Sequence, residues 1–136
     1  MGSVERFEDL EIWQLARELV REVYGMTNVE AFARDYGLKD QIRRSAVSVM
    51  NNISEGFESQ TNKLFISYLS RAKTSCGETR SVIYVALDCG YISEDNFQDL
   101  YKQCLKISRK TQKLMDYLKG FESNSRIQEA LVKYQS

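Results

Sequence analysis

The sequence contains no proline and no histidine, and each absence restricts what the protein can be. Proline breaks the interior of a helix, so its absence allows long stretches to run helical without interruption. Histidine is the commonest general base and the commonest nitrogen ligand of zinc, so its absence argues against most hydrolases and metalloenzymes. The chain also lacks a phosphate-binding loop and a dinucleotide-binding fingerprint. We therefore expect no enzymatic activity, no metal and no cofactor.

Long apolar runs are missing as well, since no segment approaches the roughly 18 consecutive apolar residues of a membrane-spanning helix. Residues 1–10 are acidic and polar, unlike a secretion signal, which is basic and then apolar. The three cysteines, Cys76, Cys89 and Cys104, are odd in number and lie among apolar helical positions. This pattern predicts reduced thiols packed in a core. Together these features predict a cytoplasmic protein.

The sequence has no net charge, because 19 Lys and Arg balance 19 Asp and Glu. A dedicated nucleic-acid-binding protein usually carries an overall positive field, so any such binding must be local here. The charges are unevenly distributed. Residues 1–35 hold four basic and eight acidic side chains, whereas residues 36–136 hold fifteen basic and eleven acidic.

Apolar residues recur at steps of three and four in four long segments, which predicts an all-α fold. We expect helices over residues 9–26, 38–55, about 62–89 and 94–119, with Gly56, Gly90 and Gly120 ending the last three. Short connections make neighbouring helices antiparallel, so residues 1–120 should form an up-down antiparallel four-helix bundle. Residues 121–136 form a C-terminal tail or a short fifth helix. This segment could dock on the bundle, dock on a neighbouring copy or stay mobile.

The second predicted helix combines its apolar stripe with a polar one, and the third carries small and polar residues that could face it. The candidate seam residues are Gln41, Ser48, Asn52, Glu55, Ser75 and Glu78. Glu78 is the expected partner of Arg43 or Arg44. These residues either satisfy one another in a partly buried seam between helices or subunits, or bind a ligand directly.

A basic cluster lies on the fourth predicted helix, at spacings that place its members opposite the apolar stripe. The cluster consists of Lys102, Lys106, Arg109, Lys110 and Lys113. It is either a nucleic-acid-binding surface or a solvated outer face whose cations complement the helix dipole. A second candidate set of nucleic-acid-binding residues is Arg43, Arg44, Arg71 and Lys73. Tyr101 and Tyr117 lie near the cluster and could stack bases.

Several of these segments together resemble the 23S rRNA intervening-sequence protein family, also called four-helix bundle proteins. The resemblance covers about residues 7–118. It rests on Phe7, Leu10, Trp13 and Ala16, on Gly37-Leu38, residues 41–48 and residues 52–56, on Ala72, Ser75 and Glu78, and on residues 90–92. Ser45 and Ser54 stand where the family usually has alanine, which adds polarity to the seam, and the proline usual before the second helix is missing.

The resemblance implies a ring-like homopentamer of helical bundles, encoded in some bacteria inside insertions of large-subunit ribosomal RNA genes. Some relatives serve as the accessory variability determinant of diversity-generating retroelements, where they bind nucleic acid and the reverse transcriptase. We therefore predict a non-catalytic homo-oligomeric accessory protein that binds nucleic acid, with structured RNA as the expected ligand, or that binds an RNA-associated partner. The alternative is a purely protein-binding oligomeric scaffold with no nucleic-acid role.

Overall fold

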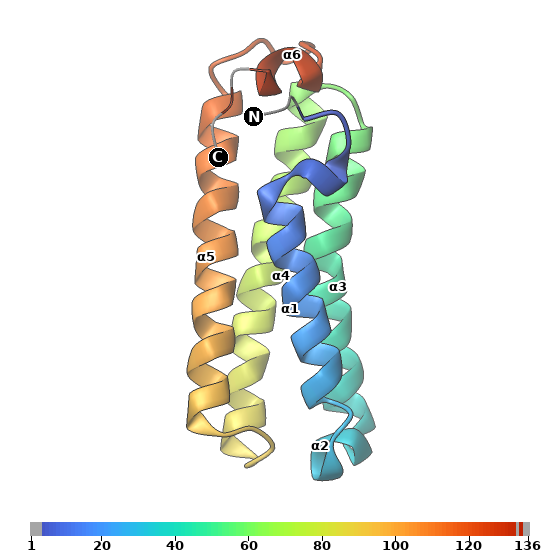
Figure 1. Cartoon of the computed structure of the whole chain (residues 1–136), viewed down its shortest axis with the longest axis vertical. Helices are drawn as coiled ribbons and strands as arrows, with labels where there is room; N and C mark the ends of the chain where they lie inside the picture. Colours follow the sequence, from blue (N-terminus) through green and yellow to red (C-terminus); the bar gives the residue numbers. More distant parts are fainter. Residues whose placement is uncertain (1–3, 133, 135–136) are drawn as a thin grey trace.

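Four long helices form the body of the protein, in a computed structural model that describes residues 4–132 and 134. They are α1 (Glu11–Met26), α3 (Tyr36–Glu58), α4 (Asn62–Asp88) and α5 (Glu94–Leu118). The shorter elements are the 3-10 helix η1 (Phe7–Asp9), α2 (Glu30–Arg34) and α6 (Ile127–Leu131). Figure 1 shows the long helices side by side along the long axis, with α2 at one end of the bundle and α6 at the other. The predicted all-α helical bundle is confirmed.

Side-chain caps define where three of the long helices begin. The side chains of Asp35, Thr61 and Ser93 each accept a hydrogen bond from the backbone N–H three residues further on, at 3.1, 3.4 and 3.1 Å. Such a bond satisfies one of the N–H groups that a helix leaves unpaired at its first turn. Because Asp35 caps α3, that helix begins at Tyr36, two residues before the predicted start.

Gly56 does not end the second long helix, contrary to the sequence-based expectation, because α3 continues to Glu58. The residue is buried against α4. A methyl group at Gly56 would lie 2.7 Å from Cβ of Tyr68 and 2.9 Å from Cδ1 of Phe65. This glycine therefore allows α3 and α4 to approach closely and has no helix-breaking role.

A single apolar core runs through the bundle. Its largest fully buried side chains are Phe32, Phe65, Leu19, Ile42, Ile53, Leu69, Ile83, Ile107, Leu114, Leu118, Ile127 and Leu131. Cys76 and Cys104 lie in this core as expected, but Cys89 is exposed because it follows the last residue of α4. None of the helices in the described part of the chain is long and apolar enough to cross a membrane.

The described part of the C-terminal segment docks on the end of the bundle. Ile127, Ala130 and Leu131 of α6 are buried in the common core. The Ile127 N–H donates to the Gln60 carbonyl at 3.0 Å, and the Tyr117 hydroxyl donates to the Ala130 carbonyl at 2.7 Å. Of the three placements considered for residues 121–136, the structure shows docking on the chain's own bundle. Residues 133, 135 and 136 lie outside the described residues.

Candidate nucleic-acid interface

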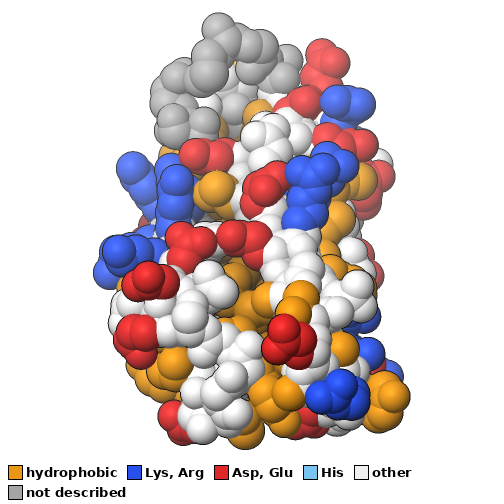
Figure 2. Space-filling model, turned by 60° about the horizontal axis from the view of Figure 1, so that its bottom comes forward, with side chains coloured by type: hydrophobic (Ala, Val, Ile, Leu, Met, Phe, Trp, Pro, Cys, Tyr) orange, Lys and Arg blue, Asp and Glu red, His pale blue; other side chains and the backbone are white. Residues whose placement is uncertain are grey.

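Four cations follow one another along the outer side of α5: Lys102, Lys106, Arg109 and Lys113, here called the basic face. All four side chains are exposed, and residues 100–115 contain no Asp or Glu. Within the described part of the chain, none of the four forms an ion pair. Figure 2 shows Lys and Arg side chains gathered on the side of the molecule where α5 lies. The four cations of the basic face therefore have no carboxylate partner within the described part of the chain.

Lys110 differs from the other members of the predicted cluster. Its Nζ donates to Oε1 of Glu11 at 3.0 Å, and both side chains are partly covered, with 35% and 39% of their surface exposed. The residue lies where α5 meets α1, about 100° around the helix from Arg109. Lys110 lies about 40° around the helix from Lys106 and on the same side of α5, but the expectation that its side chain is fully solvent-exposed is wrong, because α1 packs beside that position.

The basic face contains a shallow depression of about 300 Å³. Its lining residues are Lys102, Leu105, Lys106, Arg109 and Lys110. Leu105 provides an apolar surface between cations. From Lys102 to Lys113 the helix rises about 17 Å, so the face is long enough to follow several consecutive phosphates of one strand.

Arg43 and Arg44 lie away from the basic face, in a groove along α3. The Nε of Arg43 donates to Oγ1 of Thr27 at 2.8 Å, and its guanidinium lies 4.3 Å from the ring centroid of Tyr24. Arg44 pairs with Asp40 on its own helix at 2.8 Å. The expected pairing of either arginine with Glu78 is wrong, because both find nearer partners and Glu78 lies on an exposed side of α4.

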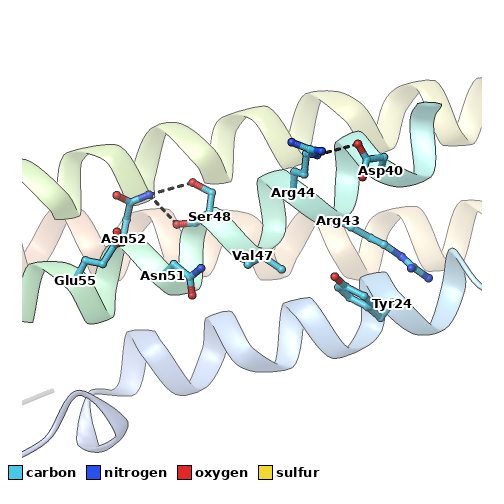
Figure 3. Close-up of a pocket in the computed structure, with 9 residues that line it drawn as sticks. All are labelled: Tyr24, Asp40, Arg43, Arg44, Val47, Ser48, Asn51, Asn52 and Glu55. Atoms are coloured by element: carbon cyan, nitrogen blue, oxygen red, sulfur yellow. Dashed lines mark hydrogen bonds and ion pairs between the residues drawn. The ribbon is translucent and has the colours of Figure 1, made fainter. Parts of the chain in front are cut away.

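The groove, here called the α3 groove, has a volume of about 510 Å³. It is lined by Tyr24, Asp40, Arg43, Arg44, Val47, Ser48, Asn51, Asn52 and Glu55. Figure 3 shows Arg43 reaching toward Tyr24 of α1, while Arg44 and Asp40 lie on the other side of α3. The groove therefore presents charges of both signs and several amides.

Arg71 and Lys73 lie on α4. The guanidinium of Arg71 lies 5.0 Å from the ring centroid of Tyr68, one turn away on the same helix. Lys73 is partly covered, and its Nζ donates to Oε1 of Gln112 on α5 at 2.8 Å. The second basic set is thus distributed over separate local contacts.

Part of the predicted seam forms between α3 and α4. The hydroxyls of Ser48 and Ser75 are 2.8 Å apart, and Nδ2 of Asn52 donates to the carbonyl and hydroxyl oxygens of Ser48 at 2.8 and 3.0 Å. A second pair was missed by sequence reasoning: Oγ1 of Thr79 donates to Oγ of Ser45 at 2.9 Å in the core. Ser45, at a position where the family usually has alanine, is the sequence feature that could have predicted this pair.

The remaining seam candidates have no such role in this structure. Gln41, Glu55 and Glu78 are exposed. Their position on the outer faces of α3 and α4 makes them available to a partner but not to each other. The hydroxyl of Tyr117 donates to the Ala130 carbonyl of the C-terminal segment, and its ring lies near those of Phe121 and Tyr134, so this candidate stacking tyrosine has structural contacts.

A search among the described residues finds no group of three or more Cys, Asp or Glu side chains placed to hold a metal ion.

Comparison with known proteins places the chain in a family. A solved structure of a protein of unknown function from the S23 ribosomal protein family of Bacteroides thetaiotaomicron matches with a TM-score of 0.70. The two sequences are 20% identical, and the match covers 76% of this chain and 97% of that chain, so the likeness shows a shared fold. No curated protein matches the sequence. The family model described as 23S rRNA-intervening sequence protein matches residues 8–113, from η1 to the basic face of α5. The chain therefore belongs to the 23S rRNA-intervening sequence protein family.

Proposed function

We propose that this protein is a non-catalytic, cytoplasmic, homo-oligomeric accessory protein that binds RNA through the basic face of α5. The observation that carries the proposal is the set of four exposed cations without carboxylate partners, in a chain whose net charge is zero. Among the described residues Arg6, Arg21, Arg44, Lys110 and Lys119 form ion pairs with carboxylates, and the other unpaired cations are spread over several helices, so the basic face is distinguished by four unpaired cations along one side of one helix. A basic surface left unpaired is suited to an external polyanion. The association of the family with 23S rRNA favours RNA as that polyanion.

Self-association is the second part of the proposal, and the α3 groove is the surface that supports it. The groove contains Asp40 and Glu55 together with Arg43 and Arg44, so a second copy could provide complementary charges. Repetition of the basic face in every subunit would raise the affinity for a long RNA by avidity. The family resemblance favours a ring of five copies.

Salt dependence tests the RNA-binding part. If four cations each contact one phosphate of a single strand, the logarithm of the affinity should fall with a slope of about −2.8 against the logarithm of the salt concentration. The double variant Lys106→Gln with Arg109→Gln keeps two cations, so its slope should flatten to about −1.4. Fluorescence anisotropy with a labelled stem-loop RNA measures both slopes.

A matched control removes the same amount of charge elsewhere. Arg34 and Lys63 are exposed at opposite ends of the bundle, so Arg34→Gln with Lys63→Gln should leave the slope at the wild-type value. Equal slopes for the two double variants would contradict binding through the basic face. A folded wild-type protein that binds no RNA at low salt would instead favour the protein-binding scaffold.

Light scattering tests the oligomer. A mass of 15.8 kDa across micromolar concentrations would identify a monomer and contradict the proposal. A fivefold mass would support the ring.

A further inference from the structure

An aromatic cluster lies on the surface where α4 meets α5, beside the start of the basic face. It consists of Tyr84, Phe97, Tyr101 and Arg80, here called the aromatic platform. The ring of Tyr84 lies 4.8 Å from that of Phe97 and 6.2 Å from that of Tyr101, measured between centroids. The guanidinium of Arg80 lies 5.6 Å from the ring centroid of Tyr101. Aromatic and guanidinium planes of this kind are what RNA-binding proteins use to stack unpaired bases.

The two tyrosines of the platform are not fully buried, and their hydroxyls have no structural hydrogen bond to a described residue. Phe97 is buried and anchors the cluster, whereas 48% of Tyr84 is exposed and Tyr101 is only partly covered. Neither tyrosine hydroxyl makes a hydrogen bond to another described residue. By contrast, Tyr91 donates to Asp35 at 2.9 Å and so has a structural contact. An exposed ring without such a contact is available to a ligand.

The platform lies beside the basic face. Tyr101 directly precedes Lys102 on α5, so the two side chains lie about 100° apart around the helix. Leu105, one turn after Tyr101, lines the depression between the cations of the basic face. Two carboxylates lie within one turn of the tyrosines, Asp88 on α4 and Asp99 on α5. Asp99 accepts a hydrogen bond from Gln103 at 3.5 Å, on the α1 side of the helix. Arg80 lies one turn before Tyr84 and Asp88 one turn after it, so the ring of Tyr84 has one charge of each sign beside it on α4.

We propose that the aromatic platform stacks an unpaired base of the RNA whose phosphates lie along the basic face. This inference rests on the proposed RNA-binding function and specifies its ligand class. The preferred ligand is RNA with single-stranded or looped nucleotides, because the bases of a continuous duplex are already stacked on their neighbours and cannot reach the rings. Since every base has a π-face, the platform should show little sequence preference.

The test compares two tyrosine variants on two labelled probes, oligouridine and a blunt RNA duplex, at one fixed salt concentration. Tyr84→Leu keeps apolar contact with Phe97 but removes the π-face, so affinity for oligouridine should fall roughly 5- to 150-fold. Tyr84→Phe keeps the ring and should bind as wild type. Neither variant should change duplex affinity or the salt slope, because neither removes a cation.

Tyr36→Leu is the matched control. Tyr36 is the first residue of α3, is 73% exposed and contacts Lys39 of the same helix, away from α5. It should leave both affinities unchanged. Oligouridine affinity that is equally high in Tyr84→Leu and wild type would overturn base stacking while leaving RNA binding in place. An equal loss for duplex would also overturn it, because the effect would not depend on unpaired bases.

Two further outcomes keep the two proposals distinguishable. A wild-type protein that binds neither probe would refute both, and would leave the platform as a candidate contact for a protein. If Tyr84→Leu fails to fold, cross-linking of wild type with 5-bromouridine-substituted RNA decides. Cross-links in the peptides that contain Tyr84 or Tyr101 support stacking, and cross-links found only elsewhere refute it.

Discussion

Gly56 and Gly77 both lie inside long helices, yet replacing each with alanine should change the free energy of unfolding in opposite directions. Alanine is favoured over glycine in a helix interior by about 1 kcal/mol. At Gly77 a methyl group would meet nothing within 4 Å, so the variant should gain most of that amount. At Gly56 the methyl group would lie 2.7 Å from Cβ of Tyr68 and 3.4 Å from the Phe65 carbonyl oxygen. Neither of these atoms can rotate away.

The clash at Gly56 must therefore be relieved by moving α3 away from α4. Overpacking of this kind costs about 1–3 kcal/mol, and the accompanying loss of contacts should outweigh the gain in helix propensity. We expect Gly56→Ala to be less stable than wild type, and Gly77→Ala to be more stable.

Urea unfolding followed by far-ultraviolet circular dichroism measures both changes. The protein concentration must be the same for all variants, because any self-association would contribute to apparent stability. With a slope of about 1–3 kcal/mol per molar urea, Gly77→Ala should raise the midpoint by roughly 0.3–1 M. A Gly56→Ala midpoint equal to that of Gly77→Ala would refute the steric argument.

Four other tests address the stability and burial of the bundle. Burial raises the pKa of the Cys104 thiol to about 12 and raises that of Cys76 further, whereas Cys89 is exposed. A thiol reagent at neutral pH should label one cysteine per chain quickly and the other two only after unfolding; rapid labelling of all three would contradict the burial. Because the unfolded thiols ionise near pH 9 and the folded ones do so at higher pH, stability should be full below that value and fall as pH rises above it. The buried Oγ1 of Thr111 has no hydrogen-bond partner among the described residues, so Thr111→Val should raise stability by about 1 kcal/mol in thermal unfolding, and a loss would indicate a hidden partner. Asn52→Ala removes two hydrogen bonds to Ser48 and should lower stability by about 1 kcal/mol in urea unfolding; an unchanged midpoint would show that water replaces them.

The helices could be predicted from the sequence because their apolar residues repeat at the helical period, and Ser93 provides a recognisable cap. The role of Gly56 could not be predicted from the sequence. A glycine that ends a helix and one that admits a neighbouring helix are identical in sequence, and only the position of Tyr68 distinguishes them. Local signals predict local structure well and tertiary contacts poorly.

In the candidate site, too, the grouping of residues along one helix could be predicted from the sequence, but the position of a neighbouring helix could not. Helical spacing correctly groups Lys102, Lys106 and Arg109 on one face, since the angle between residues of one helix is fixed. It could not separate Lys110 from them, because the position of α1 beside α5 depends on packing. Arg44 likewise meets Asp40 and not Glu78, since a partner one turn away on the same helix is always within reach.

The hydroxyl pairs between α3 and α4 bear on the order in which the bundle opens. A slide of one helix past the other by one turn, about 5.4 Å, would separate Ser45 from Thr79 and remove this polar contact between the two helices, although each hydroxyl also bonds a carbonyl of its own helix. The polar contacts of α1 with α5, such as Lys110 with Glu11, lie at the surface, where water can replace them. Native-state hydrogen exchange should therefore be slowest in α3 and α4, and α1 should be the first long helix to detach. Helix α1 is then the element that neighbouring copies can exchange most easily, as in domain swapping.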